Sequence, residues 1–385
     1  ESLMAAIQAG AGSVYFGIGK LNMRSRSSKN FTIDDLREIT RICDEHGVRS
    51  YITLNTVIYD DEIDEMKQII DAARESGVSA IIASDQSVIA YARERDVEVH
   101  MSTQTNITNL GAVKFYAAFS DVMVTARELS LEKVKAITDA IEKENITGPS
   151  GEKVKIEIFV HGALCMAVSG KCYLSLDNMN YSANRGACMQ LCRRAYTVKD
   201  KDTDLELEVE NEYIMSPKDL KTIHFLDKIL DAGVSVLKIE GRGRSPEYVK
   251  TVTRCYREAV EAYVEGSFTR DKVEQWDKEL ETVYNRGFWD GYYLGRKMGE
   301  WSEQYGSQAS KKKIYIGKVS NYFSRIGVAE ITLEANPLNK EDDIYIIGPT
   351  TGVYQGKVKE IRVDEKNTDE AKQGEICSIP VDSLV

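Results

Sequence analysis

Four of the seven cysteines of this chain lie within one stretch of 28 residues, CMAVSGKCYLSLDNMNYSANRGACMQLC. They are Cys165, Cys172, Cys188 and Cys192, with the spacing C-x6-C-x15-C-x3-C. Four thiolates can complete a tetrahedral zinc site or bind a 4Fe-4S cluster. Only Cys188 and Cys192 have the close spacing of a zinc knuckle, and the irregular pattern favours the iron–sulfur cluster. Zinc is the alternative interpretation, and reduced or regulatory thiols are the third.

The other three cysteines lie far apart, in segments with the patterns of ordinary helices and strands: Cys43, Cys255 and Cys377. We interpret them as buried small hydrophobic residues. A secreted disulfide scaffold spreads paired cysteines along the chain. One dense cluster instead indicates a metal or redox site in a reducing compartment, so we expect a cytoplasmic protein. No apolar run approaches the roughly 20 residues that span a bilayer, so we expect no membrane partner.

The net charge of −11 argues against general electrostatic binding to nucleic acid. Basic residues are nevertheless concentrated in two segments, and basic segments on an acidic protein suggest that each receives an anion. One segment surrounds the cysteines and contains Lys171, Arg185, Arg193, Arg194 and Lys199. The other contains Lys238, Arg242, Arg244, Lys250, Arg254 and Arg257.

Short β-rich runs alternate with amphipathic helical patterns over about the first 240 residues, which is typical of βαβ units and a parallel sheet. The sequence opens within a helical pattern, so we expect one further strand before Glu1, making eight. We therefore predict a TIM-like (β/α)8 barrel rather than an open doubly wound sheet, because no G-x-G-x-x-G follows the first strand. The seven visible runs are residues 13–18, 50–55, 79–84, 97–102, 121–126, 155–162 and 234–241.

The pattern changes after residue 305. Residues 306–313 resemble a small, polar and basic linker, and residues 314–385 contain short β-rich runs separated by turn signals. We predict that residues 1–305 form the barrel, with the cysteine segment inserted at about 162–212. The remainder forms a small C-terminal β-barrel.

In a βα barrel the functional residues gather at the carboxyl ends of the strands. The polar residues found there include Asn22, Arg26, Asn55, Asp85, Ser102, Arg127 and Glu128. As candidate catalytic residues we select Glu157, His161, Glu240 and His100. As candidate substrate-binding residues we select Arg24, Arg185, Arg193, Arg242, Lys238, Gln104 and Asn106.

The stretch EIFVHGALCMAVSGKCYLS resembles the signature of the collagenase-like peptidase family U-32, E-x-F-x-x-G-x-x-C-x4-G-x-C-x-x-S. Further blocks, such as NRGACMQLCRRAY and NRGFWDGYY, extend the resemblance over nearly the whole chain. The family name implies a protease, yet no G-x-S-x-G elbow, recognisable papain-like Cys-His setting or H-E-x-x-H motif is present.

Other members of this family imply different chemistry. They are oxygen-independent hydroxylases that carry a 4Fe-4S cluster on four cysteines and act on uridine in tRNA, cytidine in ribosomal RNA or a quinone precursor. The size of this chain resembles the tRNA branch, which implies 5-hydroxyuridine at the wobble position with prephenate as the oxygen donor. The resemblance also implies that the cluster ligands are Cys165, Cys172, Cys188 and Cys192.

Three hypotheses follow: an RNA hydroxylase with an iron–sulfur cluster, a metal-assisted peptidase, and a zinc-stabilised binding module without chemistry. For the first, the expected partners are the tRNA anticodon loop and a small dicarboxylate donor held by rim arginines. Assembly into a homo-oligomer, or a hetero-oligomer with a family paralogue, is left open. Local basic residues of the linker and of the C-terminal β-barrel, Lys318, Lys357 and Lys359, are expected to contact the RNA.

Overall fold

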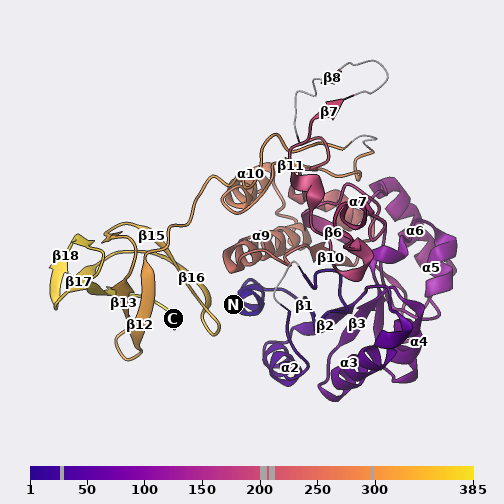
Figure 1. Ribbon diagram of the computed structural model, residues 1–385, viewed down its shortest axis with the longest axis horizontal. Helices are drawn as coiled ribbons and strands as arrows, with labels where there is room; N and C mark the ends of the chain where they lie inside the picture. The colour runs from indigo at the N-terminus through magenta and orange to yellow at the C-terminus, as the bar shows by residue number, and fades with distance from the viewer. Residues whose placement is uncertain (27–29, 200–205, 208–212, 296–298) are drawn as a thin grey trace.

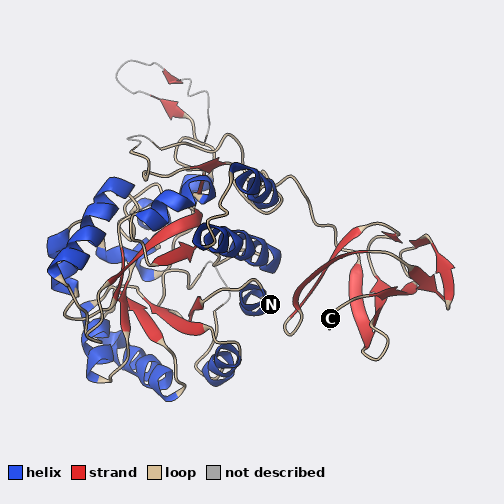
Figure 2. Ribbon diagram, turned by 180° about the vertical axis from the view of Figure 1, so that it is seen from behind, coloured by secondary structure: helices blue, strands red, loops and turns tan. Residues whose placement is uncertain are grey.

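The computed structural model describes residues 1–26, 30–199, 206–207, 213–295 and 299–385. It contains an α/β body and, at the C-terminal end of the chain, a smaller β-rich part (Figure 1). Helices pack around the outside of the strands of the body (Figure 2). None of the helices in these ranges is long and apolar enough to cross a membrane.

Seven parallel strands form the centre of the body, and all seven predicted runs are confirmed. Adjacent strands pair in parallel from the first to the sixth, and the seventh pairs with the sixth. Such strands are buried on both faces and are therefore rich in hydrophobic residues. The strands are β1 (Ser13–Gly17), β2 (Arg49–Leu54), β3 (Ala80–Ala83), β4 (Val99–Met101), β5 (Val122–Val124), β6 (Lys155–Gly162) and β10 (Val236–Ile239).

Outer helices precede, connect and follow these strands. They are α1 (Ser2–Gln8), α2 (Leu36–Glu45), α3 (Ile63–Glu75), α4 (Gln86–Glu94), α5 (Leu110–Tyr116), α6 (Leu131–Glu144), α8 (Leu226–Asp231), α9 (Pro246–Val264) and α10 (Arg270–Leu280). Helix α9 shows why such helices form. Pro246 occupies its first turn, where a missing N–H costs nothing, and Val252, Tyr256 and Ala259 recur on its buried face.

The predicted parallel sheet is present, but a closed eight-stranded barrel is not shown by the described strands. Within the described ranges no backbone ladder joins β1 to β10. A side chain contacts across these two strands: the Tyr15 hydroxyl donates to the Ile239 carbonyl at 3.1 Å. Beyond β6 the sheet continues through an antiparallel contact with β9 (Asp219–Lys221), which pairs with β11 (Phe288–Trp289).

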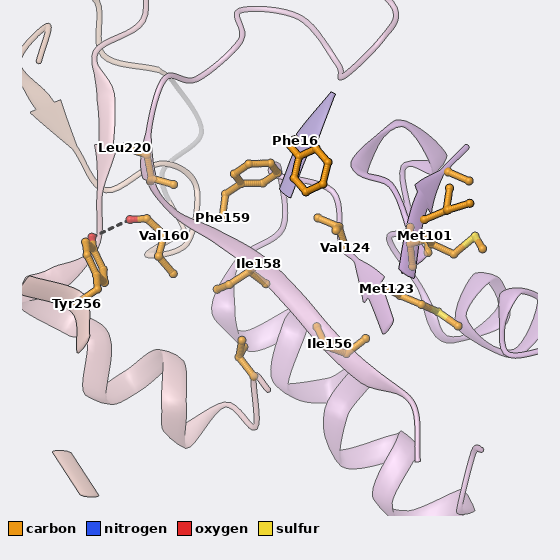
Figure 3. Close-up of a cluster of buried hydrophobic side chains, with 14 of the residues drawn as sticks. Phe16, Met101, Met123, Val124, Ile156, Ile158, Phe159, Val160, Leu220 and Tyr256 are labelled. Atoms are coloured by element: carbon orange, nitrogen blue, oxygen red, sulfur yellow. Dashed lines mark hydrogen bonds between the residues drawn. The ribbon is translucent and has the colours of Figure 1, made fainter. Parts of the chain in front are cut away.

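The core of the body lies on both faces of the sheet. Figure 3 shows Phe16, Met101, Met123 and Ile158 among the buried side chains of the strands. Tyr256 of α9 adds its ring and donates a hydrogen bond from its hydroxyl to the Val160 carbonyl at 2.8 Å. This bond satisfies a polar group that would be costly to bury alone.

The segment that carries the four cysteines follows β6. It contains α7 (Leu174–Met179) and single turns at Ala183–Arg185 and Leu191–Arg193. It continues into the two-stranded pair of β7 (Val198–Lys199) and β8 (Glu206–Leu207). The predicted end of this insertion, near residue 212, lies outside the described residues.

The C-terminal part has a separate hydrophobic core that includes Leu333, Leu338, Ile361 and Ile379. A five-stranded antiparallel sheet runs in the order β12 (Gly317–Phe323), β13 (Val328–Leu333), β20 (Ile376–Pro380), β17 (Ile361–Val363) and β18 (Lys366–Thr368). Two further pairs are β14 (Leu338–Asn339) with β19 (Glu370–Ala371), and β15 (Asp343–Gly348) with β16 (Gly352–Lys357). The C-terminal part is thus an antiparallel β region. The predicted small β-barrel is not shown to close, because no described ladder joins β12 to β18.

The hairpin of β15 and β16 contacts the α/β body. The Gln8 side-chain amide donates to the Thr351 carbonyl at 2.7 Å, and Lys250 Nζ of α9 donates to the Val353 carbonyl at 2.5 Å. These bonds place the hairpin tip against helices α1 and α9.

Candidate functional site

A pocket of about 310 Å³ opens at the carboxyl ends of β1, β6 and β10. The structure brings together here three residues predicted from the sequence, Arg24, Glu240 and Arg242. Four arginines surround a single lining carboxylate, so the pocket is suited to an anion. Its lining consists of Arg24, Ala163, Gln190, Glu240, Arg242, Gly243, Arg244, Ser245, Tyr284 and Arg286.

Glu240 directly follows β10 and is buried. Burial opposes ionisation of its carboxyl group, but Arg24, Arg127, Arg242 and Lys238 outweigh that effect and lower its pKa. Arg24 Nη2 lies 3.8 Å from Glu240 Oε1, an ion-pair distance beyond hydrogen-bond length. Glu240 Oε1 therefore has no hydrogen-bond partner among the described residues. A buried carboxylate oxygen without a partner suggests that a polar ligand completes this site.

Arg242 is held by neutral oxygens. Its guanidinium donates to Asn22 Oδ1 at 2.5 Å, to Thr53 Oγ1 at 3.2 Å and to Asn30 Oδ1 at 3.3 Å. These acceptors orient the group without cancelling its charge. Burial lowers the pKa of Arg242, and Glu240 acts in the opposite direction.

Arg244 and Arg286 form the other wall, and both contact Asp219 of β9. Each places a guanidinium nitrogen 3.2 Å from an Asp219 carboxylate oxygen. Both also lie over the Tyr284 ring, with the guanidinium carbon 4.1 Å (Arg244) and 5.1 Å (Arg286) from its centroid. We did not select Arg244, Tyr284 or Arg286 as site residues from the sequence. The NRG within the block NRGFWDGYY was the signal that could have identified Arg286.

The cysteine segment forms part of the pocket wall through Ala163 and Gln190. Burial raises the pKa of Cys192 to about 11; Arg193 opposes this, and Cys165, Cys188 and Cys172 act in the same direction as burial. The four thiols are thus close enough to interact electrostatically. Cys188 and Cys165 also contribute to the raised pKa of Arg24, after Glu240 as the main cause.

This donor set fits a group that takes four thiolates. The sulfur atoms do not themselves adopt a coordination geometry: within the described ranges, no three His, Cys, Asp or Glu side chains are arranged to hold a metal ion. Close backbone packing fixes the segment against the loop after β1, because a side chain at Gly186 would collide with the Asn22 carbonyl oxygen. The cysteine ligands therefore stay a prediction.

Two arginines predicted to bind substrate have partners within the fold and do not line the pocket. Arg185 donates to both Glu62 carboxylate oxygens at 2.5 Å and to the Val57 carbonyl at 2.7 Å. Arg193 donates to the carbonyls of Leu164 and Pro217, each at 2.6 Å. Both guanidinium groups are used to anchor the cysteine segment.

His161 and His100 are buried and do not line the pocket. Burial, together with Lys221 and Arg244, lowers the pKa of His161 to about 3. Its imidazole is therefore neutral at pH 7, which does not fit a general acid. His100 Nε2 lies 2.8 Å from Glu98 Oε1, and Glu98 precedes β4, so this contact is directed toward the amino ends of the strands.

The remaining predicted residues are not part of the pocket lining. Lys238 Nζ and Glu157 Oε1 form a buried ion pair at 2.8 Å. Gln104 Oε1 accepts from the Asn55 amide at 3.2 Å, and the Asn106 amide donates to the Gln104 carbonyl at 2.9 Å. These contacts fit support of the rim rather than direct contact with a ligand.

Comparisons with known proteins give the family. The model of peptidase family U32 matches residues 1–303. A Porphyromonas gingivalis (strain W83) protein named collagenase is 60% identical over 385 residues, which cover 100% of this chain and 93% of that protein. The tRNA hydroxylation protein P1 of Bacillus subtilis is 30% identical over 375 residues, covering 95% of this chain and 86% of its own length.

A 23S rRNA 5-hydroxycytidine synthase of Escherichia coli is 34% identical over 308 residues, which cover 77% of this chain and 44% of that protein. The matches to these relatives extend beyond the pocket and the cysteine segment to most of the chain. Together with the family model, they show that the chain belongs to peptidase family U32.

Proposed function

We propose that this protein is an oxygen-independent RNA hydroxylase that forms 5-hydroxyuridine at the tRNA wobble position. The observation that carries the proposal is the arginine-lined pocket whose wall includes residues of the four-cysteine segment. Relatives named as tRNA hydroxylation proteins support an RNA substrate. A second hydroxylation substrate, ribosomal RNA, is suggested by the relative that is named for it.

In this proposal the pocket holds the oxygen donor, with prephenate as the candidate. Prephenate carries two carboxylates, and planar guanidinium groups bind carboxylates through paired hydrogen bonds. Arg24 and Arg242 would bind and orient it, and Tyr284 would limit access of water from the opposite wall. Cys165, Cys172, Cys188 and Cys192 would hold a 4Fe-4S cluster. When bound, such a cluster supplies one-electron redox chemistry.

A peptidase is the second candidate function, because the relative that is 60% identical is named collagenase. The geometry gives it little support. The four histidines contact Ile42, Glu98, Tyr256 and Asp290. Within the described ranges none is hydrogen-bonded to a serine or cysteine, so the nucleophile–histidine pair of a serine or cysteine protease is absent there.

Mass spectrometry of tRNA nucleosides tests the proposal. Cells lacking this protein should lose 5-hydroxyuridine derivatives, and the wild-type chain should restore them. Cys172→Ala should fail to restore them and should lose iron and visible absorbance after anaerobic purification, because thiolate ligation links metal and folding. The matched control is Cys43→Ala, a buried cysteine outside the segment, which should retain iron and activity.

Unchanged wobble uridines in the deletion strain would overturn the tRNA proposal. Gelatin cleavage by the purified protein that persists in Cys172→Ala would favour the peptidase.

A further inference from the structure

Two tyrosines at the carboxyl end of the sheet each have an arginine against the ring. The Arg185 guanidinium carbon lies 3.9 Å from the centroid of the Tyr59 ring, and that of Arg26 lies 4.5 Å from the centroid of the Tyr181 ring. Tyr59 lies in the loop after β2, and Arg26 in the loop after β1. Arg185 and Tyr181 belong to the cysteine segment. The four residues therefore join the rim loops to the segment that borders the pocket.

The first pair is held rigidly. Glu62 and the Val57 carbonyl fix the Arg185 guanidinium. With that cation on its ring, Tyr59 is still 54% exposed, so a large part of its surface faces solvent. A flat aromatic surface that is immobilised in advance loses little conformational entropy when a ligand stacks on it.

The second pair is tied to the same segment. The Arg26 amide donates to the Gly186 carbonyl at 3.4 Å, and the Ser25 hydroxyl donates to the same oxygen at 3.2 Å. Gly186 directly follows Arg185, so the two arginine–tyrosine pairs are linked through a short piece of backbone. Arg26 is exposed and carries a positive charge beside a ring that is only partly buried.

The ligand chemistry follows from this combination. Unstacked nucleobases bind aromatic rings through their faces, while nearby cations contact the phosphates. A proline-rich peptide also binds aromatic surfaces, but it has no anionic backbone to match Arg26 and the pocket arginines. The overall charge of −11 requires such local contacts if RNA is to bind at all.

We propose that Tyr59 and Tyr181 form a stacking surface for the bases of a single-stranded RNA loop, adjacent to the pocket. This inference rests on the proposed RNA function and names residues that would position the substrate. Bases that flank the target would stack on the two rings and hold the loop at the pocket entrance.

Fluorescence of 2-aminopurine tests the proposal, because this base is quenched when it stacks. An anticodon stem-loop carrying 2-aminopurine beside the wobble uridine is titrated with the wild-type chain, Tyr59→Leu, Tyr181→Leu and Tyr59→Phe. Leucine keeps apolar bulk but lacks the flat ring, so we expect RNA affinity to fall by about 5- to 100-fold and quenching to be lost. Tyr59→Phe keeps the ring and should behave like the wild type.

Phe115→Ala is the matched control. Phe115 is an exposed aromatic residue, 64% accessible, on the outer helix α5, and its removal should leave affinity and quenching unchanged. Thermal unfolding of every variant checks that the fold is retained.

The outcomes separate this inference from the proposed function. If the wild-type chain neither binds nor quenches the stem-loop, both are overturned. If it binds and quenches, but both leucine variants do the same, only the stacking surface is overturned. The inference also fails if the leucine variants weaken binding of a proline-rich peptide while RNA binding is unaffected.

Discussion

The arginines beside the pocket and those of the cysteine segment differ in what their guanidinium groups bind. The pocket arginines are Arg24, Arg242, Arg244 and Arg286, and their ion pairs within the described ranges include those with Glu240 and Asp219. The segment arginines are Arg185 and Arg193, and Glu62 or backbone carbonyl oxygens occupy their donors. Formal charge is the same in both groups, but only the first four arginines line the pocket.

The difference has a simple physical origin. A guanidinium carries a fixed set of N–H donors. Each acceptor that binds one of them inside the fold leaves one donor fewer for a ligand. Neutral acceptors, such as Asn22 and Thr53 beside Arg242, orient the group but leave its charge uncompensated. The two carboxylate oxygens of Glu62 accept hydrogen bonds from Arg185 and also compensate its positive charge. Arg242 is thus suited to binding a ligand, and Arg185 to holding the structure together.

Glu62→Ala should have the largest effect, because it would leave Arg185 without its carboxylate. The pair is mostly buried, with 8% of the Glu62 side chain and 23% of the Arg185 side chain exposed. Breaking such a pair costs about 3–5 kcal/mol, which urea unfolding would measure. Arg41→Ala, which removes the exposed pairs with Glu38 and Glu45 on α2, is the control and should cost about 1 kcal/mol or less. Equal losses in the two variants would contradict the structural role of Arg185.

Replacing pocket arginines by lysine should affect donor binding more than stability. Lysine keeps the charge but cannot form paired hydrogen bonds with a carboxylate. We expect Arg24→Lys and Arg242→Lys to bind prephenate about 10- to 100-fold more weakly, by isothermal titration calorimetry, since a hydrogen bond to a charged group contributes about 1.5–3 kcal/mol. Arg193→Lys should lower the melting temperature without changing donor affinity. Normal binding by both pocket variants would place the donor elsewhere.

The smallest effect concerns His161, whose pKa is lowered to about 3 by burial, Lys221 and Arg244. An unfolded histidine has a pKa near 6.5. Below about pH 6.5 the unfolded chain therefore binds a proton that the folded chain does not, and stability falls as pH falls. This contributes up to about 1.4 kcal/mol per pH unit. His161→Phe should lack that contribution.

Urea unfolding at pH 7 and at about pH 5 measures this contribution. As the pH is lowered, the free energy of unfolding should fall more for the wild type than for His161→Phe. A difference that does not change with pH would show that folding does not lower the pKa of His161.

The sequence by itself determined the order of strands and helices and the density of cysteines. Runs such as 79–84 and 121–126 have apolar centres and are separated by helical patterns. Local patterns of this kind depend on neighbours along the chain. It also indicated that Arg24, Glu240 and Arg242 share one end of the sheet, because the carboxyl ends of parallel strands meet there.

Only the tertiary structure decided which charges are compensated and how the sheet ends. Glu62 and Arg185 are separated by 123 positions, and Asp219 reaches Arg286 across 67, so no local pattern reveals either pair. Which strands pair beyond β6 was likewise visible only in the structure, where β9 and β11 extend the sheet. Sequence reports which donors exist, whereas the fold brings each donor to an acceptor or leaves it facing a pocket.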